Sequence, residues 1–181
     1  MIALRLKEGD QLIAVREVTD SDHVVLATAH GMAIRFAMPD VRPMGRSASG
    51  VKGIGLRRGD EVVACVTVRD GDSSTMIMTV SALGYGKRTK IDLYRMQSRG
   101  GIGLINFKVS PKTGSVIGAM PVSDTDSLIL LTSTNKIIRL GVDEVRSVGR
   151  ATMGVRLVRL DEGASVVGFD TVSDSGESEE E

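Results

Sequence analysis

The sequence repeats itself, and this repeat restricts the available folds more than any other feature. Three apolar runs begin at Val24 (VVLAT), Met76 (MIMTV) and Leu128 (LILLT), at intervals of 52 and 52 residues. Each is followed by a turn, a second run (divergent in the middle unit) and a segment rich in glycine and arginine. A period of about 50 residues that carries several short strands is the size of one propeller blade.

The strands are predicted from short β-branched runs that alternate polar and apolar residues and are broken by Gly, Asp and Asn turns. In residues 136–140 (KIIRL), for example, charged and apolar side chains interleave. No window carries a sustained helical stripe, and the nearest candidate, 91–97 (IDLYRMQ), is short. We therefore expect an all-β protein with four-stranded antiparallel blades at 19–68, 69–122 and 123–172.

The two ends of the chain differ from these units. Residues 2–18 match only the last part of a unit, so 1–18 are predicted to end a preceding blade. Three blades and a part do not close a ring of four to eight. We expect an open arc or a piece of a longer protein, and repeat arrays usually begin with a complete or capped unit, which favours the piece. Residues 173–181 (SDSGESEEE) hold five acids and no base, which predicts a disordered tail.

The acidic tail changes the meaning of the net charge. The whole chain has 23 Lys and Arg against 23 Asp and Glu, and a neutral balance argues against nucleic-acid binding. Without the five acids of the tail, 23 bases face 18 acids, so the body carries a charge of +5. The tail is interpreted either as a solubilising extension or as a competitor for an anion that the body binds.

The sequence contains few residues or motifs that indicate a catalytic, metal or cofactor site. His23 and His30 have no counterparts in the other units, and no phosphate-binding loop or nucleophile elbow occurs. One cysteine and two histidines are too few for the usual zinc sites. The Asp-x-Asp pairs before the first strand of each unit (Asp20/Asp22, Asp70/Asp72, Asp124/Asp126) are interpreted as turn residues. We expect no metal, no cofactor and no enzymatic activity of these residues alone.

The sequence also bears on the compartment. No run of 18 apolar residues occurs, and charges interrupt the N-terminus where a signal peptide needs an apolar stretch. Cys65 is the single cysteine and forms no internal disulfide, so a reducing cytoplasm is expected. The residues around it predict a buried strand.

The basic residues are the stronger lead. Seven bases against one acid, Asp92, lie between residues 85 and 112, and the Gly/Arg segments place arginines at 46, 99 and 150. Repeat symmetry would set such residues at equivalent edges of successive blades, as a basic stripe that fits the regular phosphates of duplex DNA. Glycines beside the arginines would let the backbone approach phosphate. The candidate DNA-binding residues are Arg35, Arg42, Arg46, Lys52, Lys87, Arg88, Arg95, Arg99, Lys108, Arg139, Arg146, Arg150 and Arg156.

Three segments carry a family resemblance. Residues 84–89 (GYGKRT), 98–103 (SRGGIG) and 148–169 together resemble the C-terminal domain of DNA gyrase A, of which this chain looks like the C-terminal half only, and the likeness extends to residue 172. The resemblance implies a β-pinwheel, in which neighbouring blades exchange a strand, and double-stranded DNA bent around a basic rim. It also implies that the domain is an accessory part of an ATP-dependent type IIA topoisomerase that supercoils DNA. That parent protein is expected in the bacterial cytoplasm, associated with the nucleoid, with the gyrase A core and gyrase B as partners in an A2B2 complex. The chain itself is expected to be monomeric.

The chain departs from the family pattern in two ways. The family's box motif, Gln-basic-Arg-Gly-Gly-basic-Gly, belongs to a first blade that is missing here, and a degenerate version stands in a later blade. It keeps the Gln, one Arg and the glycines but has no base at the two flanking positions: Gln97, Ser98, Arg99, Gly100, Gly101, Ile102 and Gly103. Neither Tyr85 nor Tyr94 lies in a strand-cleaving context.

Three alternatives stay open. The first is the equivalent domain of topoisomerase IV, which shares the architecture. The second is a propeller that binds proteins and has no role with DNA. The third, if Met1 is a natural start, is a stand-alone architectural DNA-binding protein.

Overall fold

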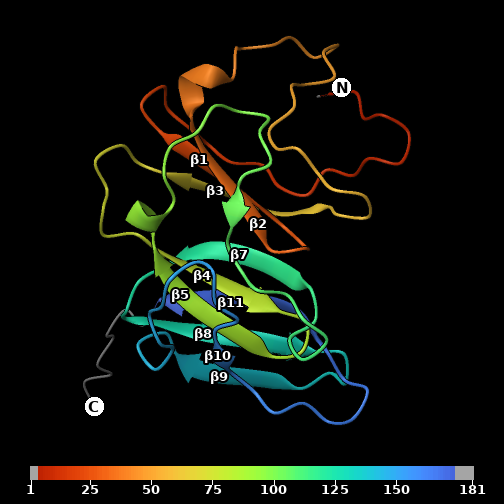
Figure 1. Cartoon of the computed structure of the whole chain (residues 1–181), viewed down its shortest axis with the longest axis vertical. Helices are drawn as coiled ribbons and strands as arrows, with labels where there is room; N and C mark the ends of the chain where they lie inside the picture. The colour runs from red at the N-terminus through yellow and green to blue at the C-terminus, as the bar shows by residue number, and fades with distance from the viewer. Residues whose placement is uncertain (1–3, 174–181) are drawn as a thin grey trace, which may run out of the picture.

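The computed structural model describes residues 4–173, which form three antiparallel sheets stacked along the long axis of the molecule (Figure 1). The first sheet has the order β3 (Val62–Val68), β1 (His23–Thr28), β2 (Met32–Ala37), β6 (Leu104–Ile105). The second has the order β10 (Val155–Arg156), β5 (Tyr85–Lys90), β4 (Met76–Ser81), β7 (Val116–Val122). The third has the order β11 (Val166–Ser173), β8 (Asp126–Thr132), β9 (Ile137–Gly141).

Each sheet begins with a hairpin, and the first one shows why the sequence forms it. Strand β1 is rich in β-branched and apolar residues, and β2 interleaves Arg35 with apolar side chains. Gly31 turns the chain between them at φ +82°, which a residue without a Cβ adopts freely. The strands then pair with Val25 opposite Arg35 and Leu26 opposite Ile34. The all-β prediction is confirmed.

The sheets exchange short strands. Strand β6 belongs to the second repeat unit but pairs with β2 in the first sheet, with Ala33 opposite Leu104. Strand β10 belongs to the third unit but pairs with β5 in the second sheet, with Gly86 opposite Val155. The predicted β-pinwheel is therefore confirmed, and each exchanged strand carries a loop of one unit across the neighbouring blade.

Several details differ from the expected pattern. The third sheet has three strands, and no described segment adds an outer strand to β9. Residues 4–18 form no strand in the described part of the chain, although Arg16 donates a hydrogen bond to the carbonyl of Cys65 (3.1 Å). Cys65 lies in β3 as expected, but it is half-buried. The tail prediction falls outside the described residues except for Ser173.

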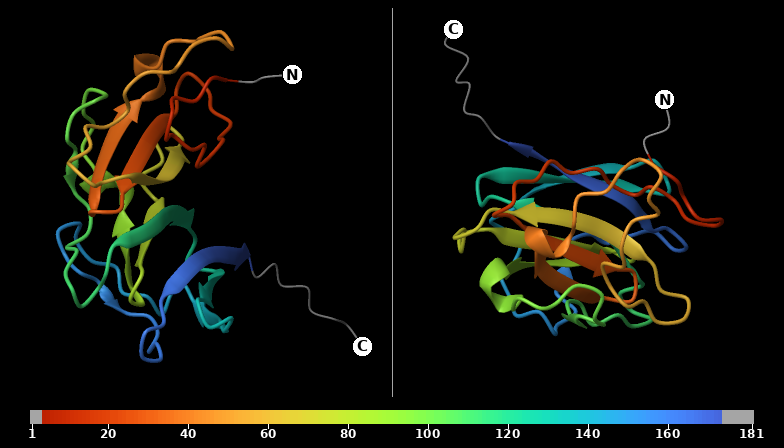
Figure 2. Two further views of the ribbon diagram at one scale, coloured as in Figure 1. Left: turned by 90° about the vertical axis from the view of Figure 1, so that its right-hand side faces the viewer. Right: turned by 90° about the horizontal axis from the view of Figure 1, so that it is seen from above.

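Most of the hydrophobic core lies between the sheets, and a further cluster around Ile34 and Phe36 packs on the other face of the first sheet. Val25, Val66 and Ile77 pack between the first and second sheets, and Val80, Leu128 and Leu130 pack between the second and third. Faces of neighbouring sheets thus bury each other, as in a propeller. Figure 2 shows the resulting arc: β3, β7 and β11 lie on the concave side, and the loops leading to β6 and β10 lie on the convex side.

Two short 3-10 helices follow the second strand of a hairpin, η1 (Met38–Asp40) and η2 (Ile91–Leu93). The second occupies the start of the segment that came nearest to a helical pattern. Helix η2 directs the chain out of the second sheet, and the following residues cross to the first sheet, where they end in β6. The backbone path after the hairpin therefore positions the Gly/Arg segment.

Candidate nucleic-acid interface

The Gly/Arg segments of the second and third units lie along the convex side, each held by backbone hydrogen bonds to the preceding unit. The amide of Gln97 donates to the carbonyl of Arg35 (2.9 Å), and the amide of Gly100 donates to that of Gly53 (2.7 Å). In the next unit, Val148 donates to the carbonyl of Arg88 (2.9 Å). The box-like segment 97–103 is therefore tied to the first blade and not free to move with its own.

The last glycine of each segment allows this close approach. A Cβ at Gly103 would lie 2.3 Å from the carbonyl oxygen of Ala33, and one at Gly154 would lie 2.2 Å from that of Gly86. The equivalent Gly50 has nothing within 4 Å. Contact with the neighbouring blade thus explains the glycines at 103 and 154. The expectation that glycines admit a phosphate is not needed at these two positions.

The arginines of the segments repeat one contact. Arg99 donates through Nη1 to the carbonyl of Lys52 and through Nε to that of Asp40 (3.1 Å). Arg150 donates through Nη1 to the carbonyl of Ile105 (2.9 Å), which is the position equivalent to Lys52 one unit later. Both residues are half-buried, and part of the hydrogen-bonding capacity of each guanidinium group connects adjacent units.

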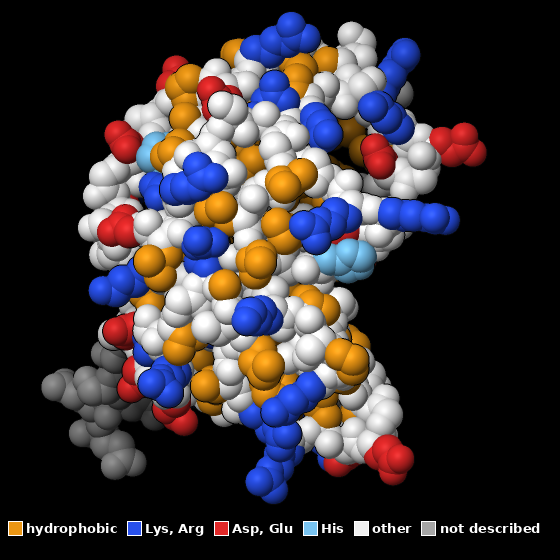
Figure 3. Space-filling view, in the orientation of Figure 1, with side chains coloured by type: hydrophobic (Ala, Val, Ile, Leu, Met, Phe, Trp, Pro, Cys, Tyr) orange, Lys and Arg blue, Asp and Glu red, His pale blue; other side chains and the backbone are white. Residues whose placement is uncertain are grey.

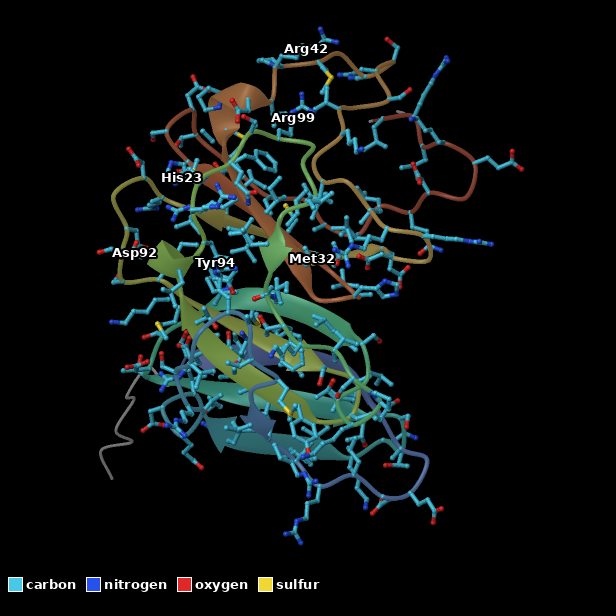
Figure 4. The ribbon with its side chains drawn as sticks, in the orientation of Figure 1. His23, Met32, Arg42, Asp92, Tyr94 and Arg99 are labelled. Atoms are coloured by element: carbon cyan, nitrogen blue, oxygen red, sulfur yellow. The ribbon has the colours of Figure 1, made fainter. Side chains whose placement is uncertain are left out.

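Most of the predicted basic residues are nevertheless exposed. Lys and Arg side chains spread over the convex face from top to bottom in Figure 3, while most visible Asp and Glu side chains lie near its outline. Arg42 and Arg99 both lie in the upper part of this face (Figure 4). The exposed members of the predicted set are Arg42, Arg46, Lys52, Arg95, Lys108, Arg139, Arg146 and Arg156.

Lys87 was predicted to contact DNA, but the structure buries its side chain completely. Its side chain is 0 % exposed, and Nζ donates to the carbonyls of Gly149 (2.9 Å) and Arg150. The ammonium also lies 5.8 Å from the centroid of the Phe107 ring. Burial lowers the pKa of Lys87 to about 7, and the nearby charge of Arg150 acts in the same direction. Lys87 is a contact between blades and does not reach a phosphate outside.

Arg88 is likewise a contact between blades, and it too was wrongly placed on the rim. It donates to the carbonyls of Val145 (2.6 Å) and Asp143 (3.1 Å) and forms an ion pair with Asp124. The exposed face of β5 that the sequence suggested is covered by the loop of the following unit.

Arg35 occupies the position equivalent to Arg88 and is half-buried. It donates to the carbonyls of Ile91 (3.2 Å) and Tyr94 (3.4 Å), and its Nη2 lies 2.8 Å from Nδ1 of His23. Arg35 thus makes contacts between blades like those of Arg88, but because it is only half-buried its binding to DNA stays a prediction.

The structure also adds Lys112, which was not among the DNA-binding residues predicted from the sequence, and places it beside Arg156, which was. Lys112 is exposed, and its Nζ lies 5.5 Å from the centroid of the Tyr85 ring. Arg156 lies at the same distance from that ring and donates to the Tyr85 hydroxyl (3.0 and 3.3 Å). The two bases are 44 positions apart in the sequence, so only the exchanged strand β10 brings them together. The unusual aromatic residue in GYGKRT was the one available signal.

Other chemistry is scarce in residues 4–173. No group of three or more His, Cys, Asp or Glu side chains could hold a metal ion. The aspartates before the first strands act as turn residues: Asp22 accepts the amide of Thr19 (2.7 Å), and Asp126 accepts that of Ser123 (2.8 Å). No helix in the described part of the chain is long and apolar enough to cross a membrane.

Comparisons with known proteins point in one direction. Residues 22–69, 75–123 and 126–173 each match the family described as "DNA gyrase C-terminal domain, beta-propeller". DNA gyrase A of Lawsonia intracellularis is 68 % identical over 172 residues, which cover 95 % of this chain and 21 % of the relative. DNA gyrase A of Salmonella typhimurium is 42 % identical over 180 residues, 99 % of this chain and 20 % of the relative. The chain thus spans about a fifth of these relatives.

Solved structures agree on the fold. The structure of a DNA gyrase A C-terminal domain superposes with a TM-score of 0.84 at 28 % identity, covering 94 % of this chain and 57 % of that one. The C-terminal domain of a DNA topoisomerase IV superposes with a TM-score of 0.87 at 23 % identity, covering 94 % of this chain and 53 % of that one. The second likeness bears on the fold alone.

Proposed function

The chain belongs to the DNA gyrase C-terminal domain family, and on that premise we propose that it binds double-stranded DNA along its convex face and bends it. The supporting observation is a set of exposed bases that form no ion pair with a carboxylate in residues 4–173: Arg42, Lys52, Arg95, Lys108 and Arg146. Cations spaced along a curved face meet phosphates that repeat along a duplex, and such contacts position DNA without reading its sequence.

The energy of bending sets a lower limit on these contacts. Smooth bending of a site of 20–30 base pairs by 40–90° costs about 1–6 kcal/mol. If about two bases per blade engage phosphates over three blades, the logarithm of the association constant falls with the logarithm of the salt concentration at a slope of about −5. Binding that is tolerant of sequence and collapses with salt is the expected behaviour.

A pair of matched variants tests the proposal. Lys108→Gln with Arg146→Gln removes two exposed charges from the convex face, and Arg5→Gln with Lys7→Gln removes two from the N-terminal segment. The first variant should flatten the salt slope by about 2, because each lost phosphate contact contributes about 0.9. The second should leave the slope unchanged. The measurement is fluorescence anisotropy with a labelled duplex across salt concentrations, and equal slopes for all three proteins would contradict the proposal.

The wider setting belongs to the same proposal. As part of a gyrase A protein, the domain would present a crossing DNA segment of fixed handedness to the catalytic core, together with gyrase B, in the bacterial cytoplasm near the nucleoid. We place the chain in gyrase and not in topoisomerase IV, because the curated relatives described above are gyrases. The bending domain itself would carry no catalytic group.

The acidic tail is proposed to compete with DNA for the basic face. Residues 174–181 lie outside the described part of the chain, but their sequence supplies five carboxylates and no base. Deletion of these residues should tighten duplex binding at low salt, where exposed charges are least screened. Unchanged affinity would leave the tail as a solubilising extension.

A further inference from the structure

A pocket of about 530 Å³ opens where the exchanged strand β10 pairs with the start of β5. Arg156 lies opposite Tyr85 in this pairing, and the loop 157–165, in blue at the lower right of Figure 1, forms the far wall. Lys112 and Arg159 complete the basic lining. The five bases proposed above to contact DNA do not line this pocket. Of its lining residues, only Arg156 was predicted from the sequence to bind DNA.

The floor of the pocket is a tyrosine with an unused hydrogen-bond donor. Tyr85 is 6 % exposed, and its ring packs with Phe107 and Val116. The hydroxyl accepts two hydrogen bonds from Arg156, and within residues 4–173 its own hydrogen is not given to an acceptor. The hydrogen bond from Arg156 lowers the pKa of Tyr85, against the opposing effect of burial. The hydroxyl is thus held by a cation and can still donate to an anion.

The charges around this tyrosine are unbalanced. The Lys112 ammonium and the Arg156 guanidinium each lie 5.5 Å from the ring centroid. The one carboxylate in the lining, Asp161, forms an ion pair with Lys136 at 2.6 Å. Within the described residues, neither Lys112 nor Arg156 pairs with an acid. Two cations held over one ring repel each other, and an anion between them would remove that repulsion.

The equivalent place in the first sheet lacks these groups. By strand register, Met32 corresponds to Tyr85 and Ile105 corresponds to Arg156, and these two residues are paired in the same way. The backbone arrangement therefore requires neither an aromatic residue nor a base. The polar pair is a local addition to the second sheet, which argues for a ligand and against a purely structural origin.

We propose that Tyr85, Lys112 and Arg156 form a phosphate-binding pocket, with Arg159 at its wall. A phosphate group offers oxygens to the phenol, the ammonium and the guanidinium at once, and such charge-assisted hydrogen bonds are among the strongest in proteins. The phosphate belongs either to the backbone of a bound duplex or to a free phosphate ion. The inference goes beyond the proposed function, since a free ion would fill the pocket whether or not the convex face binds DNA.

The test is calorimetric titration of the whole chain with inorganic phosphate in a low-salt buffer. Wild-type protein should bind one phosphate saturably. Lys112→Gln with Arg156→Gln should weaken binding at least about tenfold, because two charge-assisted hydrogen bonds to the anion are lost. Arg5→Gln with Lys7→Gln loses the same charge from exposed residues outside the pocket and the convex face, and should bind as wild type. Unsaturable binding, or equal weakening in both double variants, would overturn the proposal.

Two further measurements complete the design. Lys112 is exposed, and within residues 4–173 its side chain donates no hydrogen bond to the backbone, so weaker phosphate binding in Lys112→Gln alone would not reflect misfolding. Unchanged binding in this variant would count against the pocket. Titration of the protein saturated with duplex then identifies the source of the phosphate. Loss of phosphate binding assigns the pocket to the DNA backbone, and retained binding assigns it to a free ion. If the duplex does not bind at all, the proposed DNA function fails while the phosphate titration still stands.

Discussion

Where the Gly/Arg segment of the second unit packs on the first sheet, position 34 is a buried isoleucine beside Gly101. Where the segment of the third unit packs on the second sheet, the equivalent position is Lys87, which contacts Gly149 and Arg150. These two places, where a Gly/Arg segment and its exchanged strand pack on the preceding sheet, are called the first and the second joint. The side chains of Ile34 and Lys87 are both 0 % exposed.

The polar groups of the first joint lie elsewhere: the Tyr94 hydroxyl donates to Oδ1 of Asn106 (2.5 Å), and Asn106 donates to Thr79 (3.2 Å). One backbone frame thus accepts a buried polar cluster at two different places.

What the joints share is the close approach of the backbone and the arginine of the second strand. Gly103 and Gly154 bring the exchanged segment against the preceding blade, and Arg35 and Arg88 donate to carbonyls of the turn that follows the next hairpin. The comparison indicates that the glycine and backbone contacts between blades, here called the frame, are the same at both joints, while the buried side chains differ. The following predictions separate the contribution of the frame from that of the side chains.

The largest effect is expected for glycine replacements that break the frame. Gly103→Ala and Gly154→Ala would place a Cβ 2.3 and 2.2 Å from a carbonyl oxygen, at φ +75° and +70°. Backbone strain of about 1–2 kcal/mol adds to overpacking of about 1–3 kcal/mol. We expect the free energy of unfolding in urea to fall by about 2–5 kcal/mol at either joint. Gly50→Ala is the matched control at φ +81° in open space and should lose only the strain. A loss at Gly103 no larger than at Gly50 would refute the shared frame.

Arginine replacements should distinguish the two joints. Arg88 uses Nε and both terminal nitrogens on Val145, Asp143 and Asp124, whereas Nε of Arg35 is buried without a partner in residues 4–173. Arg88→Met breaks a short hydrogen bond to Val145 and an ion pair, whereas Arg35→Met breaks longer hydrogen bonds and also removes a buried nitrogen that has no partner. Arg88→Met should therefore cost about 3 kcal/mol against about 1 kcal/mol for Arg35→Met. Urea unfolding of both variants measures the difference. Equal losses would mean that the Nε contact and the ion pair add nothing.

The repeat made the fold predictable, since strand runs, turns and Gly/Arg segments recur in one order. Local patterns did not reveal that Lys87 and Arg88 are buried. Lys87 and Arg88 are adjacent in β5, so their side chains point to opposite faces of the sheet. The sequence does not show that different segments of the third unit cover both of them. Exposed bases such as Arg42 and Lys108 were predictable because nothing distant covers them. The pocket at Tyr85 was not, since its bases come from separate units.

Lys87 should give the second joint a dependence on pH that the first lacks. Its pKa is about 7 in the folded chain and about 10.4 when unfolded, so the unfolded chain binds more protons between these values. The free energy of unfolding should therefore rise from pH 7 to pH 10, by at most about 1.4 kcal/mol per pH unit, and lose this contribution as pH falls to 7. Lys87→Met, which copies the apolar first joint, should remove that rise.

Urea titrations of wild-type protein and variant at several pH values test this dependence. Lys90→Met is the control, because Lys90 lies on the same strand but is exposed. Other groups that titrate in this range are common to all three proteins and cancel in the comparison. A rise of equal slope in Lys87→Met and wild type would assign the dependence to another group.

The smallest expected effect concerns the ion pairs at the edge of each joint. Asp124 pairs with Arg88 at the second joint, and Asp70 lies 3.5 Å from Nε2 of His23 at the first. Both carboxylates are mostly exposed, at 72 % and 66 %, and exposed pairs contribute about 0–1 kcal/mol. Asp124→Asn should therefore lower the free energy of unfolding by less than about 1 kcal/mol, and salt should reduce the loss. Asp70→Asn should also cost less than about 1 kcal/mol, because the Asp70 carboxylate is mostly exposed. A much larger loss in either variant would mean that these side chains, and not only the glycines and backbone contacts, hold the blades together.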